Sequence, residues 1–423
     1  MAWHPHLWHP TTQVATAPAP LKVVAARGAL LQLDDGRELI DGISSWWVTL
    51  HGHAEPRIAA AIAEQAQRLE QVIFANFSHA PAEQLAERLA ALSGLERLFF
   101  SDNGSTAVEV ALKIAWQWWR NRGEPRRRLI AFAGAYHGDT VGAMALGERS
   151  LFTAPYDDLL FEVARAPWPA TWDGDAGVEA REAAALIELE RLLEQQPTAA
   201  VILEPLIQGA SGMNLVRPRF LREVERRVRA SGALLIADEV LTGFGRTGSL
   251  FACQGAGIQP DLMALSKGLT GGFLPMGVTL AREALHQAFI GTDPALTFFH
   301  GHSFTANPLG CAAALASLDL LEANPGAYAR FEARHRPRLE QLAARHSRVM
   351  RPRCIGTIAA FDLAVEQPGY LSALGRQLQQ RCLEHGVYLR PLGHVVYLLP
   401  PLCLSEAQLD RIHAALDQAI SAL

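Results

Sequence analysis

The sequence predicts an α/β fold in which a mostly parallel sheet is flanked by helices. Short apolar runs typical of buried strands recur along the chain, with helical segments between most of them. These runs end at Phe100, Phe132, Leu203, Asp238 and Leu265. Polar side chains follow each run, and ligands of parallel α/β folds bind at the carboxyl ends of the strands. A site at that edge of the sheet is therefore expected.

Composition and charge exclude several classes of function. Hydrophobic residues make up 49% of the 423 residues and charged residues 19%, as in ordinary globular proteins. A net charge of -5 gives no reason to expect nucleic acid or an anionic membrane as a partner. The five cysteines are scattered without metal-ligand spacing, and no apolar run approaches the roughly 18 residues of a membrane helix. We expect a cytoplasmic protein with no signal peptide and no metal site.

The length and the change of pattern along the chain predict two domains. Residues 56–320 are expected to form the large domain. Near residue 320 the pattern changes, and residues 321–423 are expected to form a smaller α+β domain. Residues 1–55, which carry a hairpin signal at Asp35-Gly36, are expected to join this smaller domain.

The first part of the large domain contains a candidate phosphate site. Helices are expected from Pro56 and over residues 81–92, followed by the strand Leu98–Phe100. The polar segment Ser101–Thr106 then leads directly into a helix over residues 107–119. Amides and hydroxyls at the positive end of a helix bind phosphate, although serine and threonine are also ordinary helix caps.

Further polar residues are expected at the same edge of the sheet. Tyr136, His137 and Asp139 lie among glycines after one strand, and Glu204 follows another. Residues 152–177 are rich in proline and tryptophan and are expected to form a long active-site loop.

Asp238 and Lys267 form the centre of the predicted site. They stand at the ends of two predicted strands 29 residues apart, so parallel strands would present both side chains at one edge. Lys267 alone could be a surface residue or a lysine whose neutral amine forms a Schiff base. A lysine, a carboxylate, an aromatic residue and a helix-end phosphate site together are what pyridoxal phosphate requires.

The segment Ile236–Gly248, with Lys267 downstream, resembles the signature of class III (ornithine-type) aminotransferases, and the resemblance extends over essentially the whole chain. It implies fold type I, with a large domain that binds pyridoxal phosphate and a smaller α+β domain. It also implies a homodimer with shared active sites, and small-molecule substrates comprising an amino donor and a keto-amino acid acceptor.

The resemblance also implies roles for individual residues. The catalytic residues would be Lys267, which holds the cofactor covalently and moves a proton, Asp238 and Tyr136. The cofactor would be held by Gly104, Ser105, Tyr136, Asp238 and Lys267, with His302 and Ser303 from the partner subunit. The substrate-binding residues would be Thr11, Trp46, Trp47, Tyr136, Arg246, Gly301, Arg390 and Tyr397, with Arg390 on the keto-acid carboxylate. Trp47, Asp139 and Tyr397 also have structural interpretations, as a core residue, a helix cap and a sheet residue.

Within the class, the segments Trp8–Pro10, Asp41–Trp47, Tyr136–Thr140 and Gly386–Pro391 resemble one subfamily. Its members aminate 8-amino-7-oxononanoate to 7,8-diaminononanoate in biotin biosynthesis, with S-adenosylmethionine as donor. Thr11 stands where these enzymes usually carry a tyrosine, and His302-Ser303 replaces a Pro-Thr pair, as in the lysine-using variant. Three alternatives remain: the lysine-using variant, another class III enzyme acting on an ω-amino acid or diamine, and a non-catalytic protein with this fold.

Overall fold

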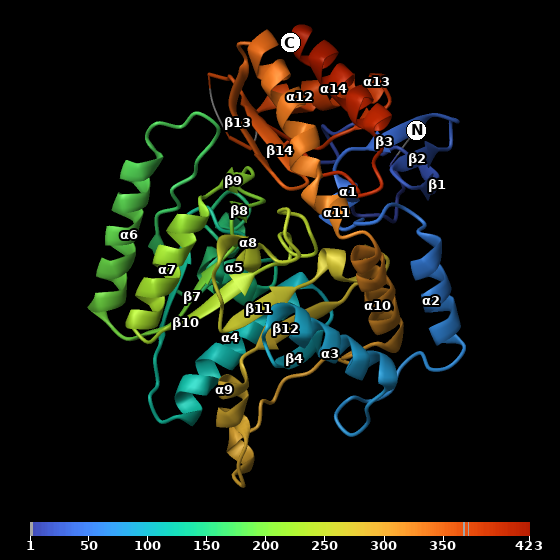
Figure 1. Cartoon of the computed structure of the whole chain (residues 1–423). Helices are drawn as coiled ribbons and strands as arrows, with labels where there is room; N and C mark the ends of the chain where they lie inside the picture. Colours follow the sequence, from blue (N-terminus) through green and yellow to red (C-terminus); the bar gives the residue numbers. More distant parts are fainter. Residues whose placement is uncertain (1–2, 367–368, 371) are drawn as a thin grey trace.

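The computed structural model describes residues 3–366, 369–370 and 372–423, and a seven-stranded sheet lies at its centre (Figure 1). The strand order is β4-β12-β11-β10-β7-β5-β6. All neighbouring strands are parallel except that β12 runs antiparallel to both β11 and β4. The strands are β4 (Arg97–Ser101), β5 (Arg128–Phe132), β6 (Ala164–Ala166), β7 (Thr198–Leu203), β10 (Leu234–Asp238), β11 (Leu262–Leu265) and β12 (Gly277–Ala281). The predicted α/β fold with a mostly parallel sheet is confirmed.

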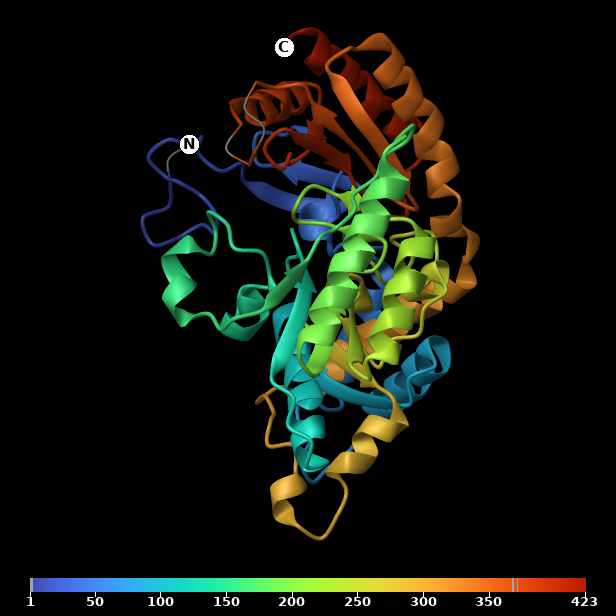
Figure 2. The same cartoon turned by 90° about the vertical axis from the view of Figure 1, so that its left-hand side faces the viewer.

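Alternate residues of the central strands pack on opposite faces of this sheet. In β10, Leu234 and Ile236 pack in the core beneath α4, whereas Leu235 and Ala237 pack in the core that includes α6 and α7. Figure 2 shows α6 and α7, in green, side by side across one face. The helices that flank the sheet are α3 (Ala80–Ser93), α4 (Gly104–Asn121), α5 (Val141–Leu146), α6 (Val178–Gln195), α7 (Pro218–Ala230) and α10 (Pro308–Ala323). Strands buried on both faces explain the continuous apolar runs in the sequence.

Both ends of the chain contribute to a second group of elements, drawn in blue and in orange to red in Figure 1. The antiparallel strands β1 (Val23–Arg27), β2 (Leu30–Leu33) and β3 (Glu38–Asp41) are joined by β15 (Val387–Tyr388), which pairs in parallel with β3. A separate sheet has the order β13-β14-β16. Its strands and the helices of this group are β13 (Val349–Ile355), β14 (Ile358–Leu363), β16 (Val395–Leu398), α12 (Phe331–Arg345), α13 (Ala373–Glu384) and α14 (Glu406–Ser421).

Shorter elements connect these parts. The remaining helices are α1 (Ser44–Trp47), α2 (Pro56–Ala66), α8 (Ala252–Ala256), α9 (Glu283–His286) and α11 (Gly326–Ala329). The short strands are β8 (Ile207–Gln208) and β9 (Asn214–Leu215), and the 3-10 helices are η1 (Ala154–Leu159), η2 (Lys267–Thr270), η3 (Gln287–Phe289) and η4 (Pro294–Leu296). Across the described ranges, no helix combines the length and apolar character needed to cross a membrane.

The prediction of one long loop over residues 152–177 was wrong in part. This segment contains η1 and β6, and β6 pairs in parallel with β5 at the edge of the large sheet. The strand has only three residues, Ala164–Ala166, with an arginine in the middle. Such a run is too short and too polar to show the period of a strand in the sequence.

Candidate active site

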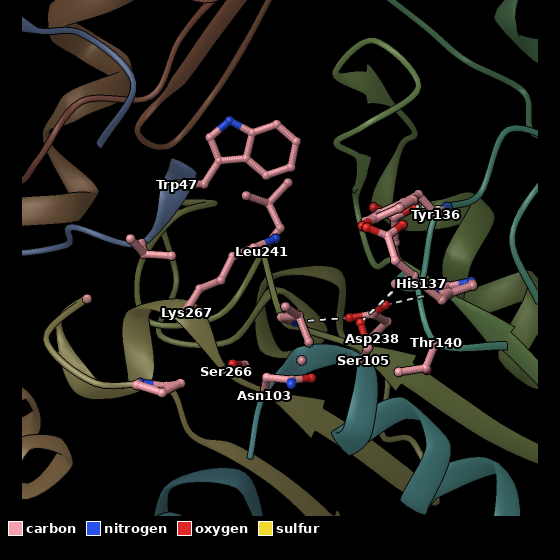
Figure 3. A pocket seen from close by; sticks show the side chains of 18 of the residues that line it. Trp47, Asn103, Ser105, Tyr136, His137, Thr140, Asp238, Leu241, Ser266 and Lys267 are labelled. Atoms are coloured by element: carbon pink, nitrogen blue, oxygen red, sulfur yellow. Dashed lines mark hydrogen bonds and ion pairs between the residues drawn. The ribbon is translucent and has the colours of Figure 1, made fainter. Parts of the chain in front are cut away.

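A cavity of about 660 Å³ opens at the carboxyl ends of the strands of the large sheet (Figure 3). The register of the strands explains its position. In the parallel pair β10 and β11, Asp238 lies opposite Ala264, so Lys267 follows three residues beyond that point at the same edge. Glu204 comes directly after the last residue of β7, the other neighbour of β10. Lys267, Asp238 and Glu204 all line the cavity, as expected of strand ends in a parallel sheet.

Asp238 is held in place by His137. Their side chains are both buried, and His137 Nδ1 lies 2.7 Å from Asp238 Oδ2 (Figure 3). The other carboxylate oxygen accepts a hydrogen bond from the amide of Val240 at 3.0 Å. A buried carboxylate oriented in this way can pair with a protonated ring nitrogen. The sequence placed His137 at this edge of the sheet, beside Tyr136, but gave no sign of its contact with Asp238.

The amine of Lys267 lies against the indole of Trp47, with 4.8 Å between Nζ and the ring centroid. Burial lowers the pKa of this amine, and the charges of Asp238 and Glu204 oppose the shift. A lowered pKa increases the neutral fraction, which is the nucleophilic form. The backbone φ of Lys267 is +44°, a strained region that non-glycine residues rarely adopt and that is enriched at functional sites. These features favour the Schiff-base interpretation of Lys267 over a surface lysine.

Glu204 is a further carboxyl group of the cavity wall. Its oxygens accept hydrogen bonds from the amides of Tyr136 at 3.1 Å and of Gly209 at 3.0 Å, so it joins two segments of the wall. Burial raises the pKa of Glu204 to about 7, with His137 and the two amides opposing the shift and Asp238 adding to it. The sequence predicts Glu204 at a strand end, but only the structure shows that Glu204 is buried.

The start of α4 forms a close-fitting concave surface. Asn103 Oδ1 accepts from the Thr106 amide at 3.0 Å, and the Thr106 hydroxyl accepts from the Asn103 amide at 2.9 Å, a capping box. A Cβ on Gly104 would lie 2.7 Å from Val240, and one on Gly138 would collide with the Ser105 hydroxyl. Only glycine permits this packing, and the first amides of a helix have no partner within the helix. The arrangement fits a phosphate group.

Tyr136 lines the cavity from the loop that follows β5, and 41% of its surface is exposed. Burial of the hydroxyl, and next the charge of Asp139, raise the pKa of Tyr136 above its ordinary value. The phenol therefore stays protonated at neutral pH and can donate a hydrogen bond. Asp139 also lines the cavity, and its amide donates to the Ser105 hydroxyl at 3.2 Å.

The neighbouring tryptophans Trp46 and Trp47 have different surroundings. Trp47 is buried and lines the cavity, and its Nε1 donates to the hydroxyl of the buried Tyr397 at 2.9 Å. Trp46 is 49% exposed, and the Arg390 guanidinium lies 5.0 Å from its ring centroid. Arg390 Nη2 also donates to the Thr11 hydroxyl at 2.9 Å. We call Thr11, Trp46 and Arg390 the Arg390 cluster.

Eight predicted site residues lie outside the cavity lining, namely the three of the Arg390 cluster, Tyr397, Arg246, Gly301, His302 and Ser303. Arg246 is fully buried behind Trp47, where it donates to the carbonyls of Trp47 and Pro400 at 3.3 and 2.9 Å, and burial lowers its pKa to about 9. His302 Nδ1 lies 3.3 Å from a carboxylate oxygen of Asp102 in the same chain. The Ser303 carbonyl accepts from Gln71, and Gly301 has open space around the position of a Cβ.

The residues present fit pyridoxal phosphate. The cavity contains an amine with a lowered pKa, a fixed carboxylate, an aromatic ring and a glycine-lined helix start, which match the four parts of that cofactor. Among the described residues, no group of three or more histidine, cysteine, aspartate or glutamate side chains could hold a metal ion.

Comparisons with known proteins agree with this geometry. Residues 11–420 match the family model described as "Aminotransferase class-III". The chain is 59% identical over 418 residues to an adenosylmethionine-8-amino-7-oxononanoate aminotransferase of Synechococcus elongatus, covering 98% of each chain. A protein of the same name from Geobacter sulfurreducens is 39% identical, with 98% of this chain and 95% of that one covered.

Solved structures show the same likeness. A crystal structure of adenosylmethionine-8-amino-7-oxononanoate aminotransferase from Methanocaldococcus jannaschii aligns with a TM-score of 0.91 at 32% identity, covering 99% of this chain and 97% of that one. An amine transaminase from an uncultivated Pseudomonas species, in its PLP-bound form, aligns with a TM-score of 0.92 at 31% identity and 99% coverage of both chains.

Proposed function

We propose a specific reaction for this chain, which belongs to the class III aminotransferase family of pyridoxal-phosphate-dependent enzymes. The reaction is transfer of an amino group from S-adenosylmethionine to 8-amino-7-oxononanoate, which gives the 7,8-diaminononanoate needed for biotin synthesis. The observation that carries this proposal is the 59% identity over 98% of the chain to the Synechococcus elongatus protein of that name.

The residues of the cavity have separable tasks in this reaction. Pyridoxal phosphate, when bound, supplies an electron sink that stabilises negative charge on the carbon being aminated. Asp238, oriented by His137, would pair with the pyridine nitrogen of the cofactor. Lys267 would hold the cofactor covalently and, once free, would carry the proton that the reaction moves. Gly104 and Ser105 would bind the phosphate at the start of α4, and Tyr136 would flank the ring.

The acceptor is a long apolar chain with a carboxylate at one end. An aromatic channel with a cation at its far end suits such a molecule. Trp47 lies beside Lys267, Tyr397 bonds to Trp47, and Arg390 stacks on the neighbouring Trp46. This order of contacts supports binding of the acceptor carboxylate by Arg390, with the keto carbon directed toward Lys267.

The proposal is tested by incubating the purified enzyme with 8-amino-7-oxononanoate and either S-adenosylmethionine or lysine, and measuring 7,8-diaminononanoate by mass spectrometry. We expect product with S-adenosylmethionine. Product with lysine alone would identify the lysine-using variant. That variant is the second candidate because of Thr11 and the His302-Ser303 pair. Turnover of 8-amino-7-oxononanoate no better than that of pyruvate or 2-oxoglutarate would refute the acceptor.

We further propose a homodimer in which each subunit completes the other's phosphate site with His302 and Ser303. Large apolar side chains are exposed near these residues, namely Ile73, Phe77, Phe299 and Phe304. Gln71 donates to the Ser303 carbonyl, so the two segments that carry them adjoin. Adjoining apolar residues on a surface favour a protein interface. Light scattering should give twice the mass of the chain, and a fully active monomer would contradict the dimer.

Two further expectations remain proposals. The parallel pairing of β3 with β15 supports a small domain formed by residues 1–55 and 321–423, with residues 56–320 as the large domain. The five free cysteines, four of them buried, support a reducing compartment such as the cytoplasm.

A further inference from the structure

The contact between Thr11 and Arg390 joins two segments that are 379 residues apart in the sequence. It lies where the chain departs from the subfamily pattern, because Thr11 replaces the usual tyrosine. The hydroxyl of Thr11 accepts from Arg390 Nη2 at 2.9 Å, while the ring of Trp46 lies 5.0 Å from the same guanidinium. Arg390 is therefore held by one polar and one aromatic contact.

The surroundings of Arg390 differ from those of many other arginines in the chain. In the described ranges, no aspartate or glutamate oxygen is recorded within 4.0 Å of its guanidinium, whereas many other arginines of the chain form such pairs. Thr11 is a neutral acceptor, so it orients the guanidinium without neutralising it. A positive charge fixed in orientation and lacking a carboxylate partner suits a ligand that brings its own carboxylate.

The cluster connects to the cavity through a short series of contacts. Trp46, whose ring centroid lies 5.0 Å from the Arg390 guanidinium, directly precedes Trp47 in the chain. The Tyr397 hydroxyl accepts from Trp47, and Trp47 lies against Lys267. Two consecutive tryptophans, Trp46 and Trp47, thus connect Arg390 with the reactive amine.

The backbone at Thr11 is itself unusual. Its φ is +49°, in the left-handed region that β-branched residues strongly avoid. This conformation is energetically unfavourable for threonine, and it persists only where surrounding contacts hold it. The hydrogen bond to Arg390 is one such contact.

We propose that Thr11 is a positioning residue for the carboxylate of the acceptor, and that it acts through Arg390. Thr11 therefore sets the affinity for the acceptor. A tyrosine at this position would stack on the adenine of the donor, and Thr11 does not contact the donor in that way. This inference rests on the proposed function, because it takes 8-amino-7-oxononanoate as the acceptor.

The test compares two threonines of the same segment. Thr11→Val keeps the shape of the side chain and removes the hydroxyl that Arg390 contacts. Thr12→Val is the matched control, because the Thr12 hydroxyl donates to the carbonyl of Pro10 and not to Arg390. Because this hydrogen bond orients Arg390 without touching the substrate, its loss should raise the KM for 8-amino-7-oxononanoate about three- to tenfold with little change in kcat. Thr11→Ser should restore the wild-type KM, and the donor KM should not change.

A double-mutant cycle tests whether Thr11 acts through Arg390. In an Arg390→Ala background, Thr11→Val should cause little further loss. The inference is overturned if the two losses simply add, or if Thr11→Val raises the donor KM as much as the acceptor KM.

Nonanoate separates this inference from the proposed function, because it has the apolar chain and the carboxylate but no group to aminate. Its dissociation constant, measured by calorimetry on the holoenzyme, should rise with Thr11→Val and not with Thr12→Val. If the wild type fails to aminate 8-amino-7-oxononanoate but shows this pattern, the proposed acceptor is wrong and the role of Thr11 stands. Equal nonanoate affinities in the wild type and Thr11→Val would overturn the role of Thr11.

Discussion

Two groups of residues around the cavity are built in different ways. The strand-end cluster, formed by Lys267, Asp238, His137 and Glu204, follows the ends of β11, β10, β5 and β7 within one sheet. The Arg390 cluster joins Thr11 of the N-terminal segment, Trp46 of α1 and Arg390, which comes just after β15. Its members are partly exposed. The proposed chemistry rests on the first cluster, whereas the second contains Thr11, one of the positions at which this chain departs from the subfamily pattern.

The difference shows how rigidity and specificity are distributed. Hydrogen bonds of the sheet fix Asp238 opposite Ala264, three residues before Lys267, so the strand register sets the approximate positions of both side chains. The Arg390 cluster depends on one hydrogen bond and one stacking contact between distant segments. Substitutions in the first cluster should therefore lower kcat, and substitutions in the second should raise the KM for one substrate.

The largest effect is expected for Lys267→Ala. Removing the amine that lines the cavity should lower kcat by many orders of magnitude, on the order of 10⁶, as for loss of a catalytic nucleophile. The visible absorbance of covalently bound cofactor should disappear at the same time. Lys22→Ala changes an exposed lysine and serves as the control. Turnover by Lys267→Ala above about one per cent of the wild-type rate would show that the strand-end cluster does not carry out the reaction.

Asp238→Asn should have the next largest effect. The change keeps the size of the side chain but removes the charge that faces His137 and the cavity, which should lower kcat by about 10²- to 10³-fold. The KM for the acceptor should change much less. Steady-state kinetics with Asp34→Asn, an exposed control, would measure both constants. A rise in acceptor KM without loss of kcat would contradict the division between the two clusters.

Arg390→Ala should change the KM for the acceptor and leave the KM for the donor unchanged. Loss of a hydrogen bond between charged groups should raise the acceptor KM by about 10- to 100-fold while kcat stays within a few-fold. Arg376→Ala on the neighbouring helix α13 is an exposed control. An equal increase in the donor KM would show that Arg390 does not distinguish the two substrates.

The sequence predicted the strand-end cluster better than the Arg390 cluster for a physical reason. Apolar runs buried on both faces mark parallel strands, and the carboxyl ends of parallel strands meet at one edge. Asp238 and Lys267 could therefore be paired from the sequence alone. His137 and Glu204 needed the fold, because their burial depends on the packing of loops around them.

No periodicity links Thr11 to Arg390. Their contact depends on how the N-terminal segment lies against the region after β15, which the sequence does not encode in any local pattern. The hydrogen bonds from Arg246 to the carbonyls of Trp47 and Pro400 likewise join segments that no local pattern connects. Long-range contacts of this kind are formed by tertiary packing and have no local signature.

The smallest and most gradual effect is expected from acid, through the buried His335 of α12 and through His413 of α14, whose ring nitrogens are buried. Burial lowers the pKa of His335 in α12 to about 3 and of His413 in α14 to about 4, with nearby arginines adding to both shifts. The unfolded chain binds protons at these histidines near pH 6.5, whereas the folded chain does not, so stability is full above pH 6.5 and falls as the pH is lowered toward 4. Lowering the pH from 7 to 5 should reduce the free energy of unfolding by about 1–2 kcal/mol for each histidine.

This loss of stability should affect the Arg390 cluster at a higher pH than the strand-end cluster. His335 and His413 belong to α12 and α14, whose apolar residues share a core with Trp47 and Tyr397, while β10 and β11 pack in the cores of the large sheet. As the pH falls to 5, the acceptor KM should rise while cofactor absorbance persists, and urea unfolding should show the lower stability. His335→Leu together with His413→Leu should flatten this pH dependence, whereas His385→Leu, an exposed control, should not. Loss of cofactor at a higher pH than loss of acceptor affinity would mean that the strand-end cluster is the less stable of the two.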